Sequence, residues 1–297
     1  MIFPKTVKIV EVGPRDGLQA EVQNVPVDIR IQFINLLSEA GLKFIETGSF
    51  VSPHWVPQMK ESDKVYQGIT KKEGVDYSIL VPNVQGYELA LTNNVTSIAV
   101  FTAASETFCH KNINVSIAES LQNFKTFIPQ AKAKGLRVRG YISCAIVCPY
   151  EGPIAPHAVH ELVKKLLSLG CDEVSLGDTI GAATPLQVKN LLKNIPAPLH
   201  KIAVHFHDTY GQAIANIYTA LEQGISIIDS SVSGLGGCPY APGASGNVAT
   251  EDVFYLLRGL GIRTDVQIEK LLKASIYIDT YLKRQTTSKA SCALRGL

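Results

Sequence analysis

The chain has 297 residues, of which 46% are hydrophobic and 18% charged, and its formal net charge is +2. This length suits one large α/β domain or two small ones, with a core large enough to fold without crosslinks. The near-neutral charge, without long runs of one sign, argues against nucleic-acid or membrane-surface binding and favours a small substrate. Six cysteines without a CxxC pair predict reduced thiols in a cytosol-like, cytoplasmic compartment.

Short apolar runs, typical of buried strands, alternate with helical patterns along the chain. We expect eight strands, at residues 7–12, 44–47, 77–81, 97–101, 137–143, 173–176, 201–206 and 227–232. The expected helices lie near residues 27–40, 58–72, 84–91, 116–134, 156–168, 185–194, 212–222 and 248–259. From the N-terminal residues we expect no presequence before the first strand, and no apolar run reaches the roughly 20 residues of a membrane span.

Eight strand–helix units predict a (β/α)8 TIM barrel over residues 5–262, within one catalytic domain of 297 residues. The alternative is a doubly wound open sheet, but no glycine-rich dinucleotide fingerprint follows the first strand. An extra C-terminal helix is expected over residues 265–281, and the tail over residues 283–297 is expected to be mobile.

Two histidines, His205 and His207, end the seventh expected strand. Residues two apart on a strand share a face, so both imidazoles can bind one cation at the barrel mouth. Asp16 follows the first strand and Asn247 the eighth, and strands 7, 8 and 1 are neighbours in a closed barrel. This donor set favours Mg²⁺ or Mn²⁺ over structural zinc. The alternative for Asp16 is a turn residue before Gly17.

Three more ionisable residues follow strand ends. Arg15 is a fixed cation that suits a substrate whose oxygens gain negative charge; alternatively, it is a surface arginine paired with Glu11 or Glu46. Glu46, on the second strand, can orient Arg15 or transfer a proton. Asp178, after the sixth strand, can anchor the site or act as a base.

Cys238 lies in a glycine-rich segment, residues 234–246. This segment can form a lid that carries the thiol over the mouth, or a backbone cradle for phosphate, or Cys238 can be an inert filler. Cys144 and Cys148 are spaced i, i+4, and we interpret them as packing residues rather than metal ligands.

Six long motifs occur together between about residues 5 and 290, namely VEVGPRDGLQ (10–19), ETGSFVSPHWVPQM (46–59), RGYISCAIVCPYEG (139–152), SLGDTIG (175–181), HFHDTYGQA (205–213) and GLGGCPYAPGASGNVATED (234–252). The combination resembles the 3-hydroxy-3-methylglutaryl-CoA lyase family. The resemblance implies a divalent-metal-dependent retro-Claisen cleavage of this thioester to acetyl-CoA and acetoacetate, a homodimer, and a place in leucine degradation or ketone-body metabolism.

The resemblance also implies roles for single residues. The implied metal ligands are Asp16, His205, His207 and Asn247, and the implied catalytic residues are Arg15, Glu46, Asp178 and Cys238. Contacts with the acyl-CoA substrate are implied for Arg15, Ser49, Lys111, Asn112 and Ser116. Cys292 resembles a thiol whose oxidation affects activity in some members. The base is left open between Asp16, Asp178 and a water on the metal.

Related metallolyases are the first alternative. A 4-hydroxy-2-oxoacid aldolase or an isopropylmalate synthase shares the Arg–Asp pair and the two histidines, but neither is expected to carry Cys238 within GGCPYA, and the synthases have a long C-terminal regulatory domain. A lyase for another 3-hydroxy-3-alkylglutaryl-CoA also remains open. A barrel without catalytic activity is disfavoured because every expected ligand is present.

Overall fold

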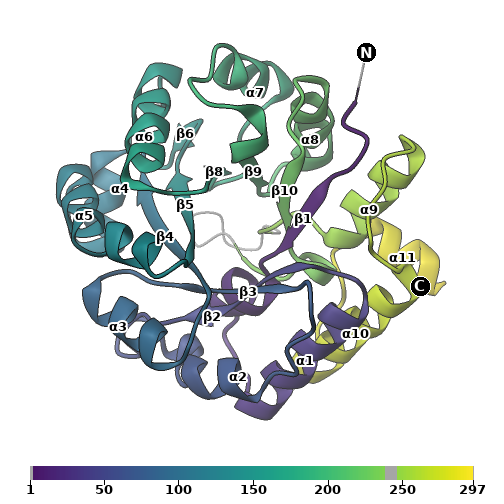
Figure 1. Ribbon diagram of the computed structural model, residues 1–297. Coiled ribbons are helices and arrows are strands. Elements are labelled where there is room, and N and C mark those ends of the chain that lie inside the picture. The colour runs from purple at the N-terminus through teal and green to yellow at the C-terminus, as the bar shows by residue number, and fades with distance from the viewer. Residues whose placement is uncertain (1–2, 238–245, 297) are drawn as a thin grey trace.

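Eight parallel strands close into a barrel in the computed structural model, which describes residues 3–237 and 246–296 (Figure 1). The strands are β1 (Lys8–Glu11), β2 (Phe44–Ser49), β3 (Asp76–Leu80), β4 (Ser97–Ala103), β5 (Arg137–Ser143), β8 (Glu173–Asp178), β9 (Ile202–Phe206) and β10 (Ile227–Ser230). Pairing of β1 with both β10 and β2 closes the barrel. The predicted TIM barrel is confirmed.

Helices between the strands form the outer layer (Figure 1). They are α1 (Val27–Glu39), α2 (Ser62–Gly68), α3 (Val84–Thr92), α5 (Ile117–Ala133), α6 (Pro156–Leu169), α7 (Pro185–Leu192), α8 (Ala213–Glu222) and α9 (Thr250–Gly259). The second helix is much shorter than the predicted 58–72. Residues Pro57–Met59 form a separate 3-10 turn, and Glu61 has a φ of 60°, which interrupts a helix.

The mouth of the barrel carries two short elements that the sequence patterns did not predict. Helix α4 (Glu106–Ile113) follows β4 and is capped by the Ser105 hydroxyl, which accepts the Phe108 N–H. Strands β6 (Val147–Cys148) and β7 (Gly152–Pro153) form a small antiparallel hairpin after β5. Both are too short for hydrophobic periodicity to reveal them.

Two helices follow the barrel, α10 (Ile268–Leu282) and α11 (Lys289–Arg295). Helix α10 packs against α1, as Figure 1 shows. The prediction of a mobile tail is wrong for the part described, up to residue 296. Asp252 on α9 accepts hydrogen bonds from the Ser288 hydroxyl and the Ala290 N–H, and these bonds anchor α11 to the barrel.

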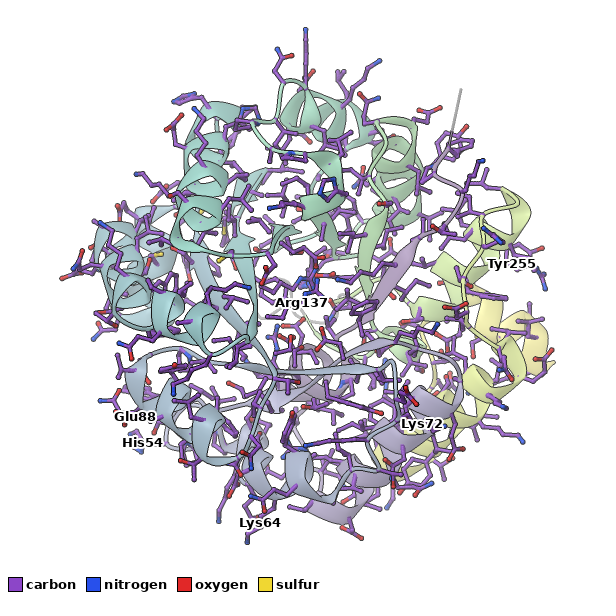
Figure 2. The ribbon with its side chains drawn as sticks, in the orientation of Figure 1. His54, Lys64, Lys72, Glu88, Arg137 and Tyr255 are labelled. Carbon is purple, nitrogen blue, oxygen red and sulfur yellow. The ribbon has the colours of Figure 1, made fainter. Side chains whose placement is uncertain are left out.

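Charged side chains fill part of the barrel interior. Figure 2 shows Arg137 near the barrel axis, where it donates to Asp76 and Glu173 at 3.0 and 2.9 Å. One layer nearer the mouth, Arg139 donates to Asp229 at 2.6 Å and pairs with Glu173 at 2.9 Å. Removing one partner from such a network would leave an uncompensated buried charge, so these residues depend on one another beneath the mouth.

Candidate metal centre and active site

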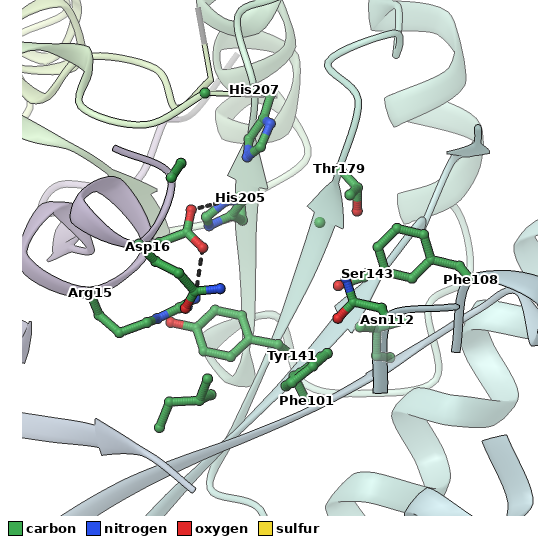
Figure 3. Close-up of a pocket in the computed structure, with 16 residues that line it drawn as sticks. Arg15, Asp16, Phe101, Phe108, Asn112, Tyr141, Ser143, Thr179, His205 and His207 are labelled. Atoms are coloured by element: carbon green, nitrogen blue, oxygen red, sulfur yellow. Dashed lines mark hydrogen bonds and ion pairs between the residues drawn. The ribbon is translucent and has the colours of Figure 1, made fainter. Parts of the chain in front are cut away.

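A cavity of about 530 Å³ opens at the carboxyl ends of the strands (Figure 3). Its polar side contains Arg15, Asp16, His205 and His207, and its apolar side contains Leu80, Phe101, Phe108 and Ile142. Tyr141 lies between them, with its ring edge-on to His205. The cavity therefore combines a charged reaction zone with an apolar wall, as expected for a small-molecule site.

A tight turn after β1 presents Arg15 and Asp16 to the cavity. The N–H groups of both residues and of Gly17 converge on the Val12 carbonyl at 2.8–3.2 Å, forming a single π-helical turn over Gly13–Gly17. Glu11 secures this turn, because one carboxylate oxygen accepts the N–H groups of Gly13 and Val232 at 2.9 Å. Such π-turns are frequent at functional sites because they redirect side chains.

Asp16, His205 and His207 form one group of potential metal ligands. One ligand atom from each lies within 4.8 Å of the others. Among the described residues, the buried Nδ1 of His207 has no hydrogen-bond partner, as expected where a cation would be the partner of this ring. Burial and the neighbouring His205 lower the pKa of His207 to about 4, which keeps its ring neutral, as a metal ligand must be. These residues fit a divalent cation.

Asp229 on β10 fixes the orientation of His205. Its carboxylate lies 3.2 Å from Nδ1 of His205 and also accepts from the Ser175 hydroxyl at 2.9 Å. A proton on Nδ1 leaves the Nε2 lone pair directed at Asp16, 3.8 Å away. Burial lowers the pKa of His205, but the neighbouring Asp229 and Asp16 outweigh burial and raise this pKa overall. At low pH, protons therefore compete with a cation for the His205 ring. Sequence reasoning missed this role of Asp229. The one signal that could have revealed it is an acidic residue within an apolar strand.

Asn247 completes the donor set. Its amide nitrogen donates to Asp16 at 2.8 Å and to the Leu235 carbonyl at 3.2 Å. Both N–H groups are thereby used, which leaves the amide oxygen for a cation. Burial would raise the pKa of Asp16, but Arg15 and His205 hold it well below its usual range, so this ligand is ionised. The structure thus brings all four predicted ligands together.

Arg15 is buried, and two carboxylates hold it. Its Nε donates to Glu46 and its Nη1 to Asp16, both at 2.7 Å. The interpretation of Arg15 as a surface residue is therefore excluded, and its partner is Glu46 rather than Glu11. Burial raises the pKa of Glu46, and Arg15 offsets part of this rise. Glu46 is fully buried and does not border the cavity.

Asp178 is also fully buried at the end of β8. Its carboxylate accepts the N–H groups of Ala182 and Ala183 at 3.1 and 3.0 Å. Burial raises its pKa to about 6 against these bonds. Its neighbours Gly177 and Thr179 line the cavity, and Asp178 holds the turn that contains Thr179.

Of the four residues named for substrate contacts besides Arg15, Asn112 lines the cavity. Lys111 precedes it on α4, exposed, with its ammonium group 4.0 Å from the centre of the Tyr150 ring. Ser116 caps α5 through the Glu119 N–H. Ser49 is buried and accepts the Val51 N–H at 3.1 Å, so its hydroxyl supports the loop after β2.

The cysteines divide into four groups, one of which is Cys171, buried in the main hydrophobic core. Cys238 lies outside the described residues. Cys144, Cys148 and Cys109 pack in one apolar cluster, and burial raises the pKa of Cys144 and Cys109, as expected for inert packing thiols. Cys292 is a half-buried free thiol on α11.

Within the described part of the chain, no helix is both long and apolar enough to cross a membrane. Residues 6–278 match the HMGL-like family model. The chain is 55% identical to the mitochondrial hydroxymethylglutaryl-CoA lyase of Bos taurus, over 98% of this chain and 91% of that protein.

Solved structures agree with this match. The hydroxymethylglutaryl-CoA lyase of Pseudomonas aeruginosa superposes with a TM-score of 0.98 at 51% identity, over 100% of this chain and 99% of that one. An HMG-CoA lyase of Acinetobacter baumannii, in complex with coenzyme A and 3-methylmalate, superposes with a TM-score of 0.93 at 35% identity, over 100% and 97% of the chains. The chain belongs to the HMGL-like family.

Proposed function

We propose that this chain cleaves 3-hydroxy-3-methylglutaryl-CoA to acetyl-CoA and acetoacetate in a reaction that requires a divalent cation. The main observation is that Asp16, His205 and His207 gather within 4.8 Å of one another beside the buried guanidinium of Arg15. The similarity to hydroxymethylglutaryl-CoA lyases over almost the whole chain supports this substrate.

The reaction breaks the bond between C2 and C3 of the acyl chain. The C3 hydroxyl passes its proton to a base, either the Asp16 carboxylate, which borders the cavity, or water, and becomes the ketone of acetoacetate. The electrons of the broken C2–C3 bond move onto the thioester as an enolate. A bound divalent cation supplies Lewis acidity, which lowers the pKa of a hydroxyl that faces it.

Arg15 is the residue that stabilises the enolate oxygen. Its guanidinium borders the cavity and is held by Glu46 and Asp16, so it needs no reorganisation when negative charge develops. Glu46 acts by fixing Arg15. Asp178 acts by holding the turn that carries Thr179. Cys238 donates the proton that converts the enolate carbon to the methyl group of acetyl-CoA.

The cation is Mg²⁺ or Mn²⁺, because two of the four donors are oxygens and no thiolate faces the described site. The acyl-CoA substrate enters beside α4, where Asn112 lines the cavity and Lys111 offers a positive charge. Ser49 and Ser116 support the loop after β2 and the start of α5, and so shape this entrance indirectly.

We also propose that the protein is a cytoplasmic homodimer without nucleic-acid or membrane partners, and that it serves leucine degradation or ketone-body metabolism. The free thiols of the described cysteines and the net charge of +2 support the compartment and the absence of nucleic acid. Family resemblance supports the dimer and the pathway. Analytical ultracentrifugation tests the dimer.

The deciding experiment measures acetoacetate release from 3-hydroxy-3-methylglutaryl-CoA. We expect release with Mg²⁺ or Mn²⁺, none after a chelator removes divalent ions, and recovery when either ion is restored. The matched control substrate is 3-hydroxyglutaryl-CoA, which lacks only the C3 methyl group. Its cleavage yields an aldehyde instead of acetoacetate, so release of acetyl-CoA, the product common to both substrates, is compared to separate acyl preference from the requirement for metal. A folded protein that binds Mn²⁺ by calorimetry but releases no acetoacetate would refute the proposal.

A further inference from the structure

The turn after β10 contains a residue in a backbone conformation that side chains rarely adopt. Ser233 has a φ of 61°, lies within the short 3-10 turn Val232–Gly234, and is fully buried. A residue other than glycine persists there only when its surroundings over-determine it, and such positions cluster at functional sites. The residues that contact Ser233 therefore indicate the function of this strained turn.

Three elements from distant parts of the chain hold Ser233. Glu251, at the start of α9, accepts its N–H at 2.9 and 3.1 Å. Asp279 on α10 accepts its hydroxyl at 2.6 and 2.8 Å. Its carbonyl accepts the Thr287 N–H at 3.2 Å from the segment between α10 and α11.

Arg295, near the end of α11, binds the carboxylate that holds Ser233. Its two terminal nitrogens lie 3.2 and 3.1 Å from Asp279, and one also donates to the Ser275 hydroxyl. The side chains of Arg295 and Asp279 are only 10% and 6% exposed. Both nitrogens donate to the same oxygen, Oδ2, while Ser233 contacts both Asp279 oxygens, so the carboxylate is held from two sides by charge-assisted hydrogen bonds. The two helices beyond the barrel thus meet at Asp279, the carboxylate that holds Ser233.

The turn leads directly to a candidate metal ligand. Two residues after Ser233, the Leu235 carbonyl accepts the Asn247 amide at 3.2 Å. The next residue, Gly236, approaches so closely that a Cβ there would lie 2.8 Å from the Asn247 amide nitrogen. The position of residues 233–236 therefore sets the direction of the Asn247 amide oxygen.

We propose that Arg295 and Asp279 are positioning residues for Asn247. They hold Ser233, and through Ser233 the turn over residues 233–236, so that the Asn247 oxygen faces the cation site between Asp16 and the two histidines. This inference rests on the metal-dependent function proposed above, and it makes the C-terminal helices part of the active site rather than an appendage to the barrel.

The test removes the charge of Arg295 in the full-length protein and measures Mn²⁺ binding directly. Arg295→Met retains most of the side-chain volume, and Lys273→Met makes the same chemical change at an exposed position of α10. We expect Arg295→Met to weaken Mn²⁺ binding about tenfold by calorimetry, the low end for a residue that orients a ligand. It should also lower kcat more than it raises KM. Lys273→Met should leave both unchanged, and Arg295→Lys should restore part of the affinity.

Wild-type Mn²⁺ affinity in folded Arg295→Met, measured well below its melting temperature, would overturn the proposal, since a purely structural residue lowers stability without changing the binding site. If Arg295→Met does not fold, Ser233→Gly replaces it. Glycine adopts the same φ without strain but loses the hydroxyl bond to Asp279, and the same loss of affinity is expected. Failure of the wild type to cleave the thioester would refute the proposed lyase activity and leave the Mn²⁺ comparison decisive for this inference.

Discussion

Replacing Arg15 with glutamine tests the chemistry of the site most directly. In the native protein Arg15 is 7% exposed and donates to Glu46 and Asp16 at 2.7 Å. Removing one well-aimed donor from a developing oxyanion costs roughly 3–4 kcal/mol of transition-state stabilisation, which corresponds to a fall in kcat of about two to three powers of ten. Acetoacetate release at saturating substrate and Mg²⁺ measures this fall.

The same substitution leaves Glu46 buried without its counterion. Breaking one partner of a buried pair costs about 3 kcal/mol or more, unless the remaining group becomes neutral. Because burial already raises the pKa of Glu46, loss of Arg15 raises it further. When the pKa of a carboxyl is higher in the folded than in the unfolded state, the folded protein loses stability as the pH rises from the unfolded to the folded pKa. We therefore expect Arg15→Gln to be less stable at pH 8 than at pH 5, relative to wild type.

A double variant separates catalysis from stability. Arg15→Gln with Glu46→Gln removes the buried charge, so urea unfolding should recover most of the lost stability at pH 8. Acetoacetate release should stay low, because the oxyanion donor is still missing. Turnover close to wild type in either folded variant would refute the role of Arg15. Recovery of activity together with stability would show that the first variant had merely been misfolded.

Asp229→Asn should weaken Mn²⁺ binding about 10- to 100-fold, measured by calorimetry, because His205 loses the carboxylate that fixes its tautomer; unchanged affinity would argue against this role. Cys238→Ser should lower the rate of acetoacetate release with little change in Mn²⁺ affinity, and a large loss of affinity would make the thiol a ligand instead. Burial raises the pKa of Glu11 from 4.5 to about 7, so ionisation of this group should lower the free energy of unfolding by up to about 3 kcal/mol as pH rises between these values. Glu11→Gln should flatten that dependence in urea unfolding at pH 5 and 8, and an unaltered slope would contradict the assignment.

Local features of the sequence predicted the barrel and the candidate metal ligands at its mouth. Apolar runs and glycine-terminated helices are patterns among residues close together in sequence. The eight strand–helix units could therefore be recognised along the chain. His205 and His207 share a face because alternate residues of a strand always do. Asp16 and Asn247 could be added to the predicted set of ligands because, in a closed barrel, the last strand lies beside the first.

Contacts between distant segments were decided only by the tertiary structure. The sequence left Arg15 open between Glu11 and Glu46, and the fold selects Glu46, since Glu11 is occupied by the backbone N–H groups of Gly13 and Val232. Asp229 contacts His205 on the neighbouring strand and Arg139 across the barrel interior, 90 residues away in sequence. Pattern and spacing carry no information about such pairs.

The C-terminal segment shows the same limit. Its sequence is polar and predicts a mobile tail. A helix of only seven residues is unstable alone and is too short to show a clear hydrophobic pattern. Asp252 and Asp279 supply hydrogen bonds and an ion pair that stabilise α11 from outside. The sequence by itself determined the barrel and the residues able to bind a cation. Only the folded chain determined what orients them, because that orientation depends on carboxylates contributed by other strands and helices.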